Sequence, residues 1–411
     1  VSRTDENGLP TLIRQETDRA LDRLAPEAGG MVQAVWFDAG PGRAGRLLLA
    51  LHHLVVDGVS WRILLPDLAE AWEAAGAGHD ARLQPVGTSF RRWAEHLAGS
   101  AAEPARMAEL PVWDGISGRP ERLLGSRRLD PARDTAGTAR SLTLILEPEQ
   151  AEPVLTTVPS AFNAGVNDVL LTALALAVGD WRRRQGAGDD TSVLVDLEGH
   201  GREEFLAGID LSRTVGWFTS LFPVRLDPGR LDRADVWAGG TAAADALKRV
   251  KEQLRALPDN GLGYGMLRYL HPGTAAALGN RPGPQISFNY LGRFDASADT
   301  EPAYWTADPL AEVLSAGADA AMPLAHCLEV NVLTRSTADG PRLVATWSWP
   351  DGVLAEPDVR ALAETWFDAL NALSAHTGQA GATGWTPSDL PLVSLSQAEI
   401  DLLESEWRNS S

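Results

Sequence analysis

Two adjacent histidines, His52 and His53, end an apolar stretch of the chain, and Asp57 follows four residues after the second histidine. An imidazole ring accepts or donates a proton near neutral pH, so a positioned histidine here could act as a general acid or base. The apolar run 46–53 is typical of a strand, and Leu47, Leu49 and Leu51 share one face of it. Because side chains alternate between the two faces of a strand, we expect one histidine to pack in the core and the other to face a cavity.

The residues that follow the histidines narrow the chemistry. Asp57 could pair with a cation and so hold the turn, while Gly58 would let the backbone approach closely. A metal site built from His52, His53 and Asp57 is the alternative. It is disfavoured because adjacent strand histidines diverge, the sequence has no HExxH pattern or cysteine–histidine cluster, and Cys327 is its only cysteine.

A carboxylate forms a second candidate group. Glu198 stands at the end of the apolar run 192–197 in the stretch "EGHGRE", in which two glycines flank His200. A polar strand exit with a glycine turn is the structural interpretation. The functional interpretation is a carboxylate at the mouth of a cavity, where partial desolvation would raise its pKa toward neutrality. With a histidine, Glu198 would then form an acid/base pair, which predicts proton transfer.

Two further stretches place single hydrogen-bonding groups among aromatic and small residues. Thr219 and Ser220 lie in "GWFTSLFP", and Asn289 and Tyr290 lie in "SFNYLG". These stretches are either ordinary core strands or the lining of a channel. A phosphate loop and a GxSxG elbow are absent, and "GPGRAG" at 40–45 lies in a predicted hairpin and opens no helix, so nucleotide chemistry is unsupported.

The hydrophobic pattern predicts the elements that position these groups. Apolar residues at Trp61, Leu64, Leu65, Leu68 and Trp72 have the spacing of one helical face, so the histidines should lie at a strand-to-helix junction. Strands are predicted over 32–37, 46–53, 141–146, 192–197, 218–226, 285–292, 328–333 and 343–349. Helices are predicted over 12–24, 89–101, 166–181, 242–257 and 359–374, with a cap at Asn167 or Asp168 for the third of them. A turn is predicted over 261–265, and a capping box at Ser396 and Glu399.

Length and composition set the class of protein. A chain of 411 residues is too long for one ordinary core and suits two lobes. Its 44% hydrophobic and 22% charged residues indicate a globular α/β or α+β protein, and no apolar run is long enough to cross a bilayer. A net charge of −19 would repel a phosphate-rich polymer, which disfavours nucleic acid as a partner. The single cysteine and the lack of a signal-peptide pattern favour the cytoplasm.

Taken together, "HHLVVDGVSWRIL", "DLEGHGREE", "RTVGWFTSLFPVRL", "GLGYG", "SFNYLGRFD" and "PSDLPLVSLSQAEIDLL" resemble the epimerization domain of non-ribosomal peptide synthetases, within the condensation-domain superfamily. The HHxxxDG element is shared by the whole superfamily. The glutamate-bearing "EGHGRE", with "RTVGWFTS" and "NYLG", is similar to the epimerization branch. The motifs run in family order from residue 36 to residue 405. Family members usually carry several dozen more residues before the histidine motif, so we expect the amino-terminal lobe to be incomplete at its start.

The resemblance implies an α/β fold of two chloramphenicol acetyltransferase-like lobes that form a V, with an active-site tunnel between them. Residues 1–150 would form the lobe that carries HHxxxDG, and residues 151–411 the lobe that carries "EGHGRE", "RTVGWFTS" and "NYLG". The substrate would be an aminoacyl or peptidyl thioester on the phosphopantetheine arm of a peptidyl carrier protein. The domain itself would bind no cofactor and no metal, and its partners would be the carrier protein and neighbouring synthetase domains.

Inversion of an amino-acid α-carbon removes a proton from one face and returns one to the other. Our hypothesis is that His53 and Glu198 are this acid/base pair, with the direction of each role left open, while His52 packs or orients and Asp57 anchors the turn by a salt bridge. The enolate oxygen needs a hydrogen-bond donor, and His53, a backbone amide near Gly58, or the Asn289 and Tyr290 region could supply it. The alternatives are a condensation domain that forms a peptide bond and a catalytically silent domain that docks carrier proteins.

Overall fold

The computed structural model describes residues 8–186, 188, 190–202, 208–295, 308, 319–379 and 384–410. The chain divides into two compact units. The first consists of residues 1–97, 200–219 and 299–318, and the second of residues 98–199, 220–298 and 319–411. This division differs from the predicted boundary at residue 150, because residues 98–150 join the second unit and a later segment, 200–219, returns to the first.

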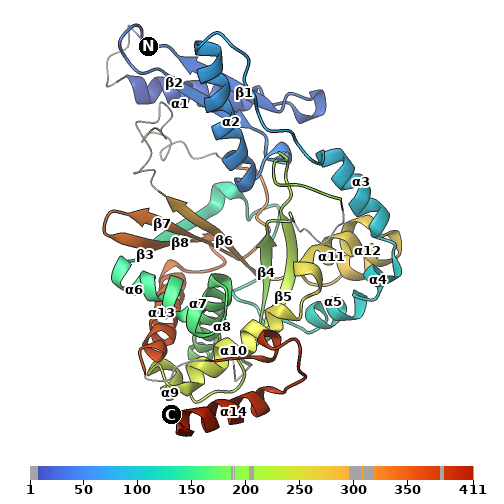
Figure 1. Ribbon diagram of the computed structural model, residues 1–411, viewed down its shortest axis with the longest axis vertical. Coiled ribbons are helices and arrows are strands. Elements are labelled where there is room, and N and C mark those ends of the chain that lie inside the picture. The colour runs from blue at the N-terminus through green and yellow to red at the C-terminus, as the bar shows by residue number, and fades with distance from the viewer. Residues whose placement is uncertain are drawn as a thin grey trace. The chain divides into compact units, whose positions relative to one another are not determined.

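The first unit begins with a helix and a two-stranded antiparallel sheet. Its elements are α1 (Leu9–Asp22), β1 (Val32–Phe37), β2 (Arg46–Leu51), a 3₁₀ helix (His53–Val55) and α2 (Gly58–Gly76), and α3 (Phe90–Ser100) starts in this unit. β1 and β2 form the predicted hairpin (Figure 1). The register places Val32 opposite Leu51. However, β2 ends at Leu51, two residues earlier than predicted, so neither His52 nor His53 belongs to the strand.

A six-stranded mixed sheet organises the second unit. Its strands are β3 (Ala139–Leu146), β4 (Val193–Gly199), β5 (Ser220–Leu226), β6 (Ile286–Asp295), β7 (Leu328–Thr337) and β8 (Gly340–Pro350), in the order β3-β8-β7-β6-β4-β5. β6 runs parallel to both β4 and β7, and the other pairs are antiparallel. The helices are α4 (Pro104–Met107), α5 (Leu110–Ser117), α6 (Pro148–Glu152), α7 (Val158–Ala161), α8 (Val166–Arg184), α9 (Arg233–Trp237), α10 (Thr241–Arg255), α11 (Leu262–Gly265), α12 (Pro272–Gly279), α13 (Glu356–Thr377) and α14 (Gln397–Ser410). The mixed α/β class is therefore confirmed.

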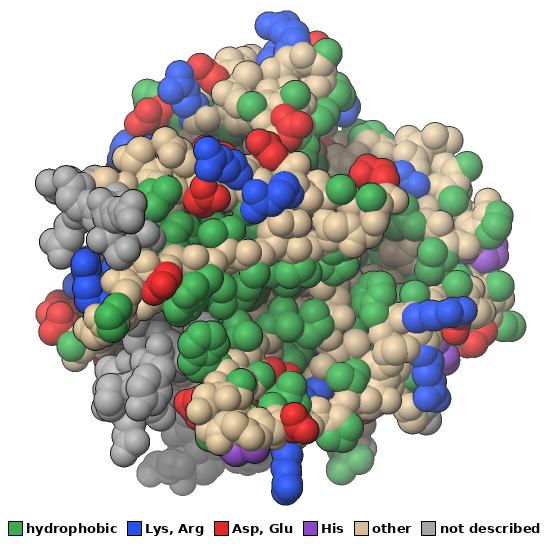
Figure 2. Space-filling model, turned by 90° about the horizontal axis from the view of Figure 1, so that it is seen from above, with side chains coloured by type: hydrophobic (Ala, Val, Ile, Leu, Met, Phe, Trp, Pro, Cys, Tyr) green, Lys and Arg blue, Asp and Glu red, His purple; other side chains and the backbone are tan. Residues whose placement is uncertain are grey.

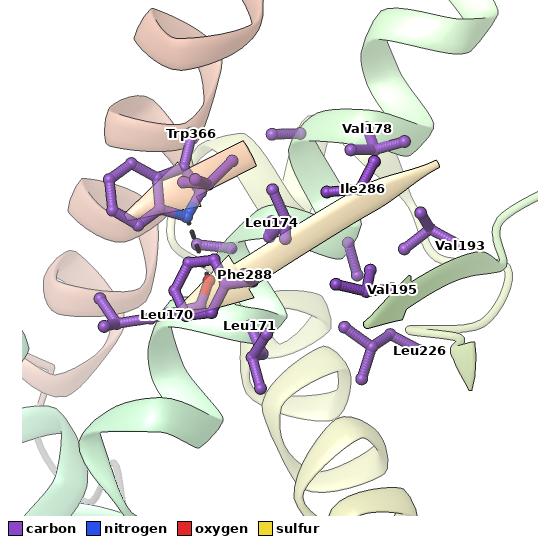
Figure 3. Close-up of a cluster of buried hydrophobic side chains, with 14 of the residues drawn as sticks. Leu170, Leu171, Leu174, Val178, Val193, Val195, Leu226, Ile286, Phe288 and Trp366 are labelled. Atoms are coloured by element: carbon purple, nitrogen blue, oxygen red, sulfur yellow. Dashed lines mark hydrogen bonds between the residues drawn. The ribbon is translucent and has the colours of Figure 1, made fainter. Parts of the chain in front are cut away.

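The main core lies against one face of this sheet. α8, α10 and α13 lie side by side (Figure 1), and α8 is buried nearly all round, as expected for a helix that is apolar on most of its surface. Val195 and Phe288 of the sheet pack into the same cluster (Figure 3). The indole nitrogen of Trp366 in α13 donates to the carbonyl oxygen of Leu170 in α8 at 3.0 Å, so the buried polar atom is satisfied (Figure 3).

The opposite face of the sheet is rich in polar side chains, because strand residues alternate between faces. We call it the polar face, and its members include Ser141 and Thr143 of β3, Asp196 and Glu198 of β4, Ser287 and Asn289 of β6, Glu329 and Asn331 of β7, and Thr346 and Ser348 of β8. The register puts Asp196 opposite Ser287 and Ser287 opposite Glu329. Candidate site residues on β4 and β6 therefore share a rigid surface whose reverse side is the core.

Several local predictions can be compared with the structure. The capping box at Ser396 is confirmed, because its amide donates to Glu399 at 2.7 Å. The helix predicted over 166–181 begins after Gly165, and Asp168 accepts from the Gly165 amide at 2.7 Å, so Asp168 assists the cap without being the cap residue. The turn predicted over "GLGYG" was wrong, since this stretch closes a 3₁₀ helix and forms α11.

Charged side chains do not gather into one surface of a single sign on the face drawn in Figure 2. Among the described residues of that face, lysine and arginine side chains stand near aspartate and glutamate, with hydrophobic side chains between them (Figure 2). Within the described part of the chain, no single helix is long and apolar enough to span a membrane, although the bent pair 148–161 and 166–184 passes the same test of length and composition.

Asp134 predicts how the stability of the second unit depends on pH. Arg127 donates to both of its carboxylate oxygens, at 2.6 and 2.7 Å, and the amide of Asp130 donates at 2.7 Å. The hydrogen bonds from Arg127 outweigh burial and lower the pKa of Asp134 from 3.8 to about 2. The unfolded chain thus binds this proton more tightly, so the stabilisation is complete above about pH 4 and is lost as the pH falls toward 2.

We expect this pair to contribute about 2 kcal/mol to the free energy of unfolding at neutral pH. Urea unfolding of the wild type and Arg127→Met between pH 6 and pH 2 measures it, and the difference between the two proteins should shrink in acid. Arg140→Met is the control, because its salt bridge to Asp351 is exposed and should contribute little at any pH. A difference that stays constant from pH 6 to pH 2 would contradict the assignment.

Candidate functional site

The two histidines lie in a turn that follows β2. His52 has extended backbone angles and caps the 3₁₀ helix that starts at His53, and its Nδ1 accepts a hydrogen bond from the amide of Leu54 at 3.2 Å. His52 is half-buried, whereas His53 is exposed. The two side chains do differ in environment, but the alternation of a strand is not the reason, since the strand has already ended.

An aromatic ring covers one side of His53. The ring centroids of His53 and Trp217 lie 4.6 Å apart, at an interplanar angle of 49°. Trp217 belongs to the segment 200–219 that returns to the first unit, and 44% of its surface is exposed. The sequence interpretation did not single out Trp217. Its only signal was its place in "RTVGWFTS", a motif quoted for the family resemblance.

Asp57 starts the helix that follows the histidine turn. It is the N-cap of α2, and its Oδ1 accepts from the amide and the hydroxyl of Ser60, each at 2.7 Å. α2 therefore begins at Gly58, three residues before the first apolar residue of the predicted helical face. A Cβ atom added to Gly58 would meet nothing within 4 Å, so close packing within the chain does not require glycine here.

Arg202 is the cation that pairs with Asp57. Its Nη2 lies 3.1 and 3.2 Å from the two carboxylate oxygens, and its Nη1 donates to the carbonyl oxygens of Leu211 and Thr214 at 2.9 and 2.6 Å. The guanidinium carbon stands 4.0 Å from the centroid of the Phe218 ring. The sequence predicted a salt bridge at Asp57 but could not name the arginine, which lies in "EGHGRE" itself.

The electrostatic state of Asp57 follows from this packing. Burial would raise the pKa of its carboxyl group, but the hydrogen bonds from Ser60, the amide of Phe218 and the charge of Arg202 together hold that pKa below its ordinary value. Asp57 is therefore ionised near neutral pH. A buried, ionised and fully paired carboxylate is a structural anchor, and here it fixes the end of the turn that carries His53 to the segment that carries Trp217.

Glu198 lies on the polar face of the second unit. It is the penultimate residue of β4, and the Nδ2 of Asn289 on β6 donates to its Oε2 at 2.7 Å. The structure thus brings together two predicted site residues that are 91 positions apart. The side chain of Glu198 is exposed, so the desolvation predicted at a cavity mouth would have to come from a bound substrate.

The glycines of "EGHGRE" are explained by close approaches. A Cβ atom on Gly199 would lie 2.7 Å from the Oγ of Ser220, and one on Gly201, whose φ is +65°, would lie 1.6 Å from the carbonyl oxygen of Phe218. His200 stands exposed between them, and its Nδ1 accepts from the amide of Arg202 at 3.1 Å. The interpretation as a polar strand exit with a glycine turn therefore describes the geometry, and it does not exclude a role for Glu198.

The remaining candidates do not all share one face. Tyr290 packs toward the core, on the side opposite Asn289, and its hydroxyl lies 2.8 Å from the Oγ1 of Thr334. Ser220 begins β5 opposite Gly199, and Thr219 precedes it, half-buried. Among the residues that the structure describes, no group of three or more histidine, cysteine, aspartate or glutamate side chains is placed to hold a metal ion.

Comparison with known families shows to which family the chain belongs. The model of the condensation domain matches residues 10–319, and the chain therefore belongs to the condensation-domain family. The resemblance predicted from the motifs is confirmed at this level. A linear gramicidin synthase protein of Brevibacillus parabrevis is 38% identical over 407 residues, which cover 97% of this chain and 5% of that protein. Tyrocidine synthase 1 of the same organism is 32% identical over 401 residues, which cover 97% of this chain and 35% of that protein. The chain thus spans a small part of the length of these relatives.

Solved structures agree with the fold. The crystal structure of the epimerization domain from the third module of tyrocidine synthetase B is similar with a TM-score of 0.75 and 29% identity, over 91% of this chain and 78% of that one. The first condensation domain of the CDA synthetase is similar with a TM-score of 0.56 and 20% identity, over 92% of this chain and 74% of that one. At that identity the second likeness shows a shared fold.

Proposed function

We propose that this chain epimerizes the α-carbon of an aminoacyl or peptidyl thioester that a carrier protein presents on its phosphopantetheine arm, in non-ribosomal peptide synthesis. The observation that carries the proposal is the carboxylate of Glu198, held by Asn289 at 2.7 Å at the end of a strand on the polar face. A reaction that joins an acyl donor to an amine needs no carboxylate there. The greater similarity to a solved epimerization domain than to a condensation domain supports the same choice.

The chemistry requires two proton-transfer groups. One group takes the α-proton and leaves a planar enolate of the thioester, and the other gives a proton to the opposite face, so charge and protons balance over one inversion. His53 and Glu198 are the two groups, and both belong to side-chain types that can exchange protons near neutral pH once their environment is tuned. Deuterium labelling of each enantiomer of the substrate decides which group removes the α-proton and which group returns it.

The enolate oxygen also needs a hydrogen-bond donor. Of the candidates named from the sequence, Tyr290 is the weakest, because its hydroxyl is engaged with Thr334 on the core side of the sheet. Asn289 remains, since its amide has a second N–H besides the one that it donates to Glu198. His53 and the backbone amides near Gly58 remain as alternatives.

The carrier protein is the proposed partner, together with neighbouring synthetase domains, and the domain needs no cofactor of its own because the arm belongs to the carrier. A covalent tether raises the effective concentration of the carrier, so a surface of net charge −19 does not need strong affinity for it. The proposed setting is the cytoplasm, and nucleic acid is not a proposed partner.

The direct test loads the upstream carrier protein with an L-aminoacyl thioester and adds the domain in deuterated water. We expect an unchanged backbone mass apart from deuterium at the α-carbon, with a mixture of L and D products after hydrolysis and chiral analysis. A longer peptide would instead identify condensation. Binding of the carrier with no α-proton exchange would identify a silent docking domain.

A further inference from the structure

A largely buried, hydrogen-bonded pair of titratable side chains lies on the same face of the sheet as Glu198 and has no part in the reaction described above. His326 precedes β7, and its Nε2 lies 2.8 Å from the Oδ2 of Asp196 on β4. The side chains are 9% and 13% exposed, respectively. Titratable groups are seldom this buried unless they are paired, so each of the two side chains holds the other in place as its hydrogen-bond partner.

Asp196 shares the polar face with Glu198. The two residues are alternate members of one strand, so their side chains project to the same side, with α-carbons about 7 Å apart. Asp196 is opposite Ser287 in the neighbouring strand β6, and Asn289, which binds Glu198, is the next residue of β6 on that side. The pair thus lies two residues along β4 from the proposed catalytic carboxylate, on the same face of the sheet.

Among the described residues, Tyr264 and Arg268 lie near Asp196 and keep a constant charge over the relevant pH range. Burial raises the pKa of Tyr264 to about 12, and the negative charge of Asp196 adds to that shift, so Tyr264 stays neutral. Arg268, which hydrogen-bonds to Tyr264, stays positive. Glu329 is level with Asp196 in the register of the sheet, but it belongs to β7, two strands from β4. Asp134 and Arg127 lie near Cys327, the residue after His326.

We propose that Asp196 and His326 are a positioning pair whose net charge sets the proton affinity of Glu198, an inference that rests on the proposed role of Glu198 in proton transfer. With His326 protonated the pair is neutral. When His326 loses its proton the pair carries one negative charge, which favours the protonated form of the neighbouring carboxyl group.

This electrostatic role predicts shifts of opposite sign in two variants. The comparison applies at a pH at which His326 carries its proton. There, Asp196→Asn leaves an uncompensated positive charge and should lower the pKa of Glu198, whereas His326→Gln leaves an uncompensated negative charge and should raise it. At about 7 Å each shift should be roughly half to one pKa unit. The double variant is neutral again and should return to the wild-type value.

Carbon-13 NMR of the full chain, with glutamate labelled at the side-chain carboxyl, measures this directly, and Glu198→Gln assigns the signal. Glu329→Gln is the matched control, because it removes a carboxylate of the same face at a greater distance and should shift the signal by less. The pH profile of inversion should move in the same directions. Because the NMR titration needs no turnover, a chain that fails to epimerize would defeat the proposed function without deciding this inference.

Shifts of the same sign in both single variants, or no shift in folded protein, would overturn the proposal and leave the pair a purely structural contact. If Asp196→Asn does not fold, as judged by circular dichroism, His326→Gln decides the question, because glutamine keeps an N–H donor for Asp196 but never carries a charge. A raised Glu198 pKa in that variant supports the proposal, and an unchanged one refutes it.

Discussion

The Glu198→Gln variant is expected to lose roughly a hundredfold to ten-thousandfold of the rate of inversion, the usual contribution of one positioned acid or base. Glutamine keeps a side-chain oxygen that can accept the 2.7 Å hydrogen bond from Asn289, and position 198 is exposed, so the fold should be unaffected. The amide cannot take up or release a proton at accessible pH. We therefore expect the loss in kcat, with little change in KM for the loaded carrier.

His53→Ala should cause a loss of similar size, and the two variants together decide the roles of the two groups. If each group serves one face of the planar intermediate, a variant that lacks one of them can still exchange the α-proton of the enantiomer served by the other. Wash-in of deuterium into L-substrate only, or D-substrate only, without inversion would then identify the surviving base. Glu329→Gln, a carboxylate on the same face of the sheet, should keep the wild-type rate.

The measurement is deuterium incorporation and chirality of the hydrolysed substrate over a time course. Unchanged inversion in both His53→Ala and Glu198→Gln would exclude proton transfer by these residues. A loss that is confined to one of them would mean that the other group has been misassigned, and the wash-in pattern of the active variant would show for which enantiomer a second base is still present.

Regular elements could be predicted from the sequence because their signal is local. β1 has the predicted bounds of residues 32–37, and the helices predicted over 166–181 and 359–374 correspond to α8 and α13. The histidine turn could not be predicted in this way. Its backbone departs from the strand where the side chain of His52 accepts from the amide of Leu54, and a periodicity of two gives no sign of such a local hydrogen bond.

Other features of the site could not be predicted because the residues that pair are distant in sequence. Asp57 and Arg202 are 145 positions apart, and so no pattern within a single window could pair them. "EGHGRE" also serves both units, because β4 ends at Gly199 and the chain enters the first unit at His200. One short motif thus supplies the proposed catalytic carboxylate to the sheet and the arginine that anchors the histidine turn, which a single boundary at residue 150 could not describe.

The pairing of Asp57 with Arg202 predicts the other large effect. Arg202→Met leaves a buried carboxylate without its cation, and we expect a loss of about 3 kcal/mol in the free energy of unfolding of the first unit at neutral pH, the lower end for a broken buried pair. The hydrogen bonds from Ser60 and the amide of Phe218 remain and limit the loss. Inversion should also fall, because the turn that carries His53 ends at this anchor.

The pH dependence separates this loss from a simple packing defect. In the wild type the pKa of Asp57 is lowered on folding, so the stabilisation is present above the unfolded pKa of 3.8 and is lost as the pH falls through the folded value. Without Arg202, burial is opposed by fewer hydrogen bonds and should raise the folded pKa above 3.8, so the defect should shrink in acid and grow as the pH rises. Urea unfolding at pH 4.5 and pH 7.5 checks the sign.

Two further variants separate the charge of Arg202 from its other contacts. Arg202→Lys keeps the positive charge but cannot donate from two guanidinium nitrogens at once. Its free energy of unfolding should therefore lie between those of Arg202→Met and the wild type. Asp57→Asn with Arg202→Met should be less destabilised than Arg202→Met at pH 7.5, because no carboxylate is left unpaired. An equal loss at both pH values would mean that Arg202 acts through its contacts with Leu211, Thr214 and the Phe218 ring, and not through the charge of Asp57.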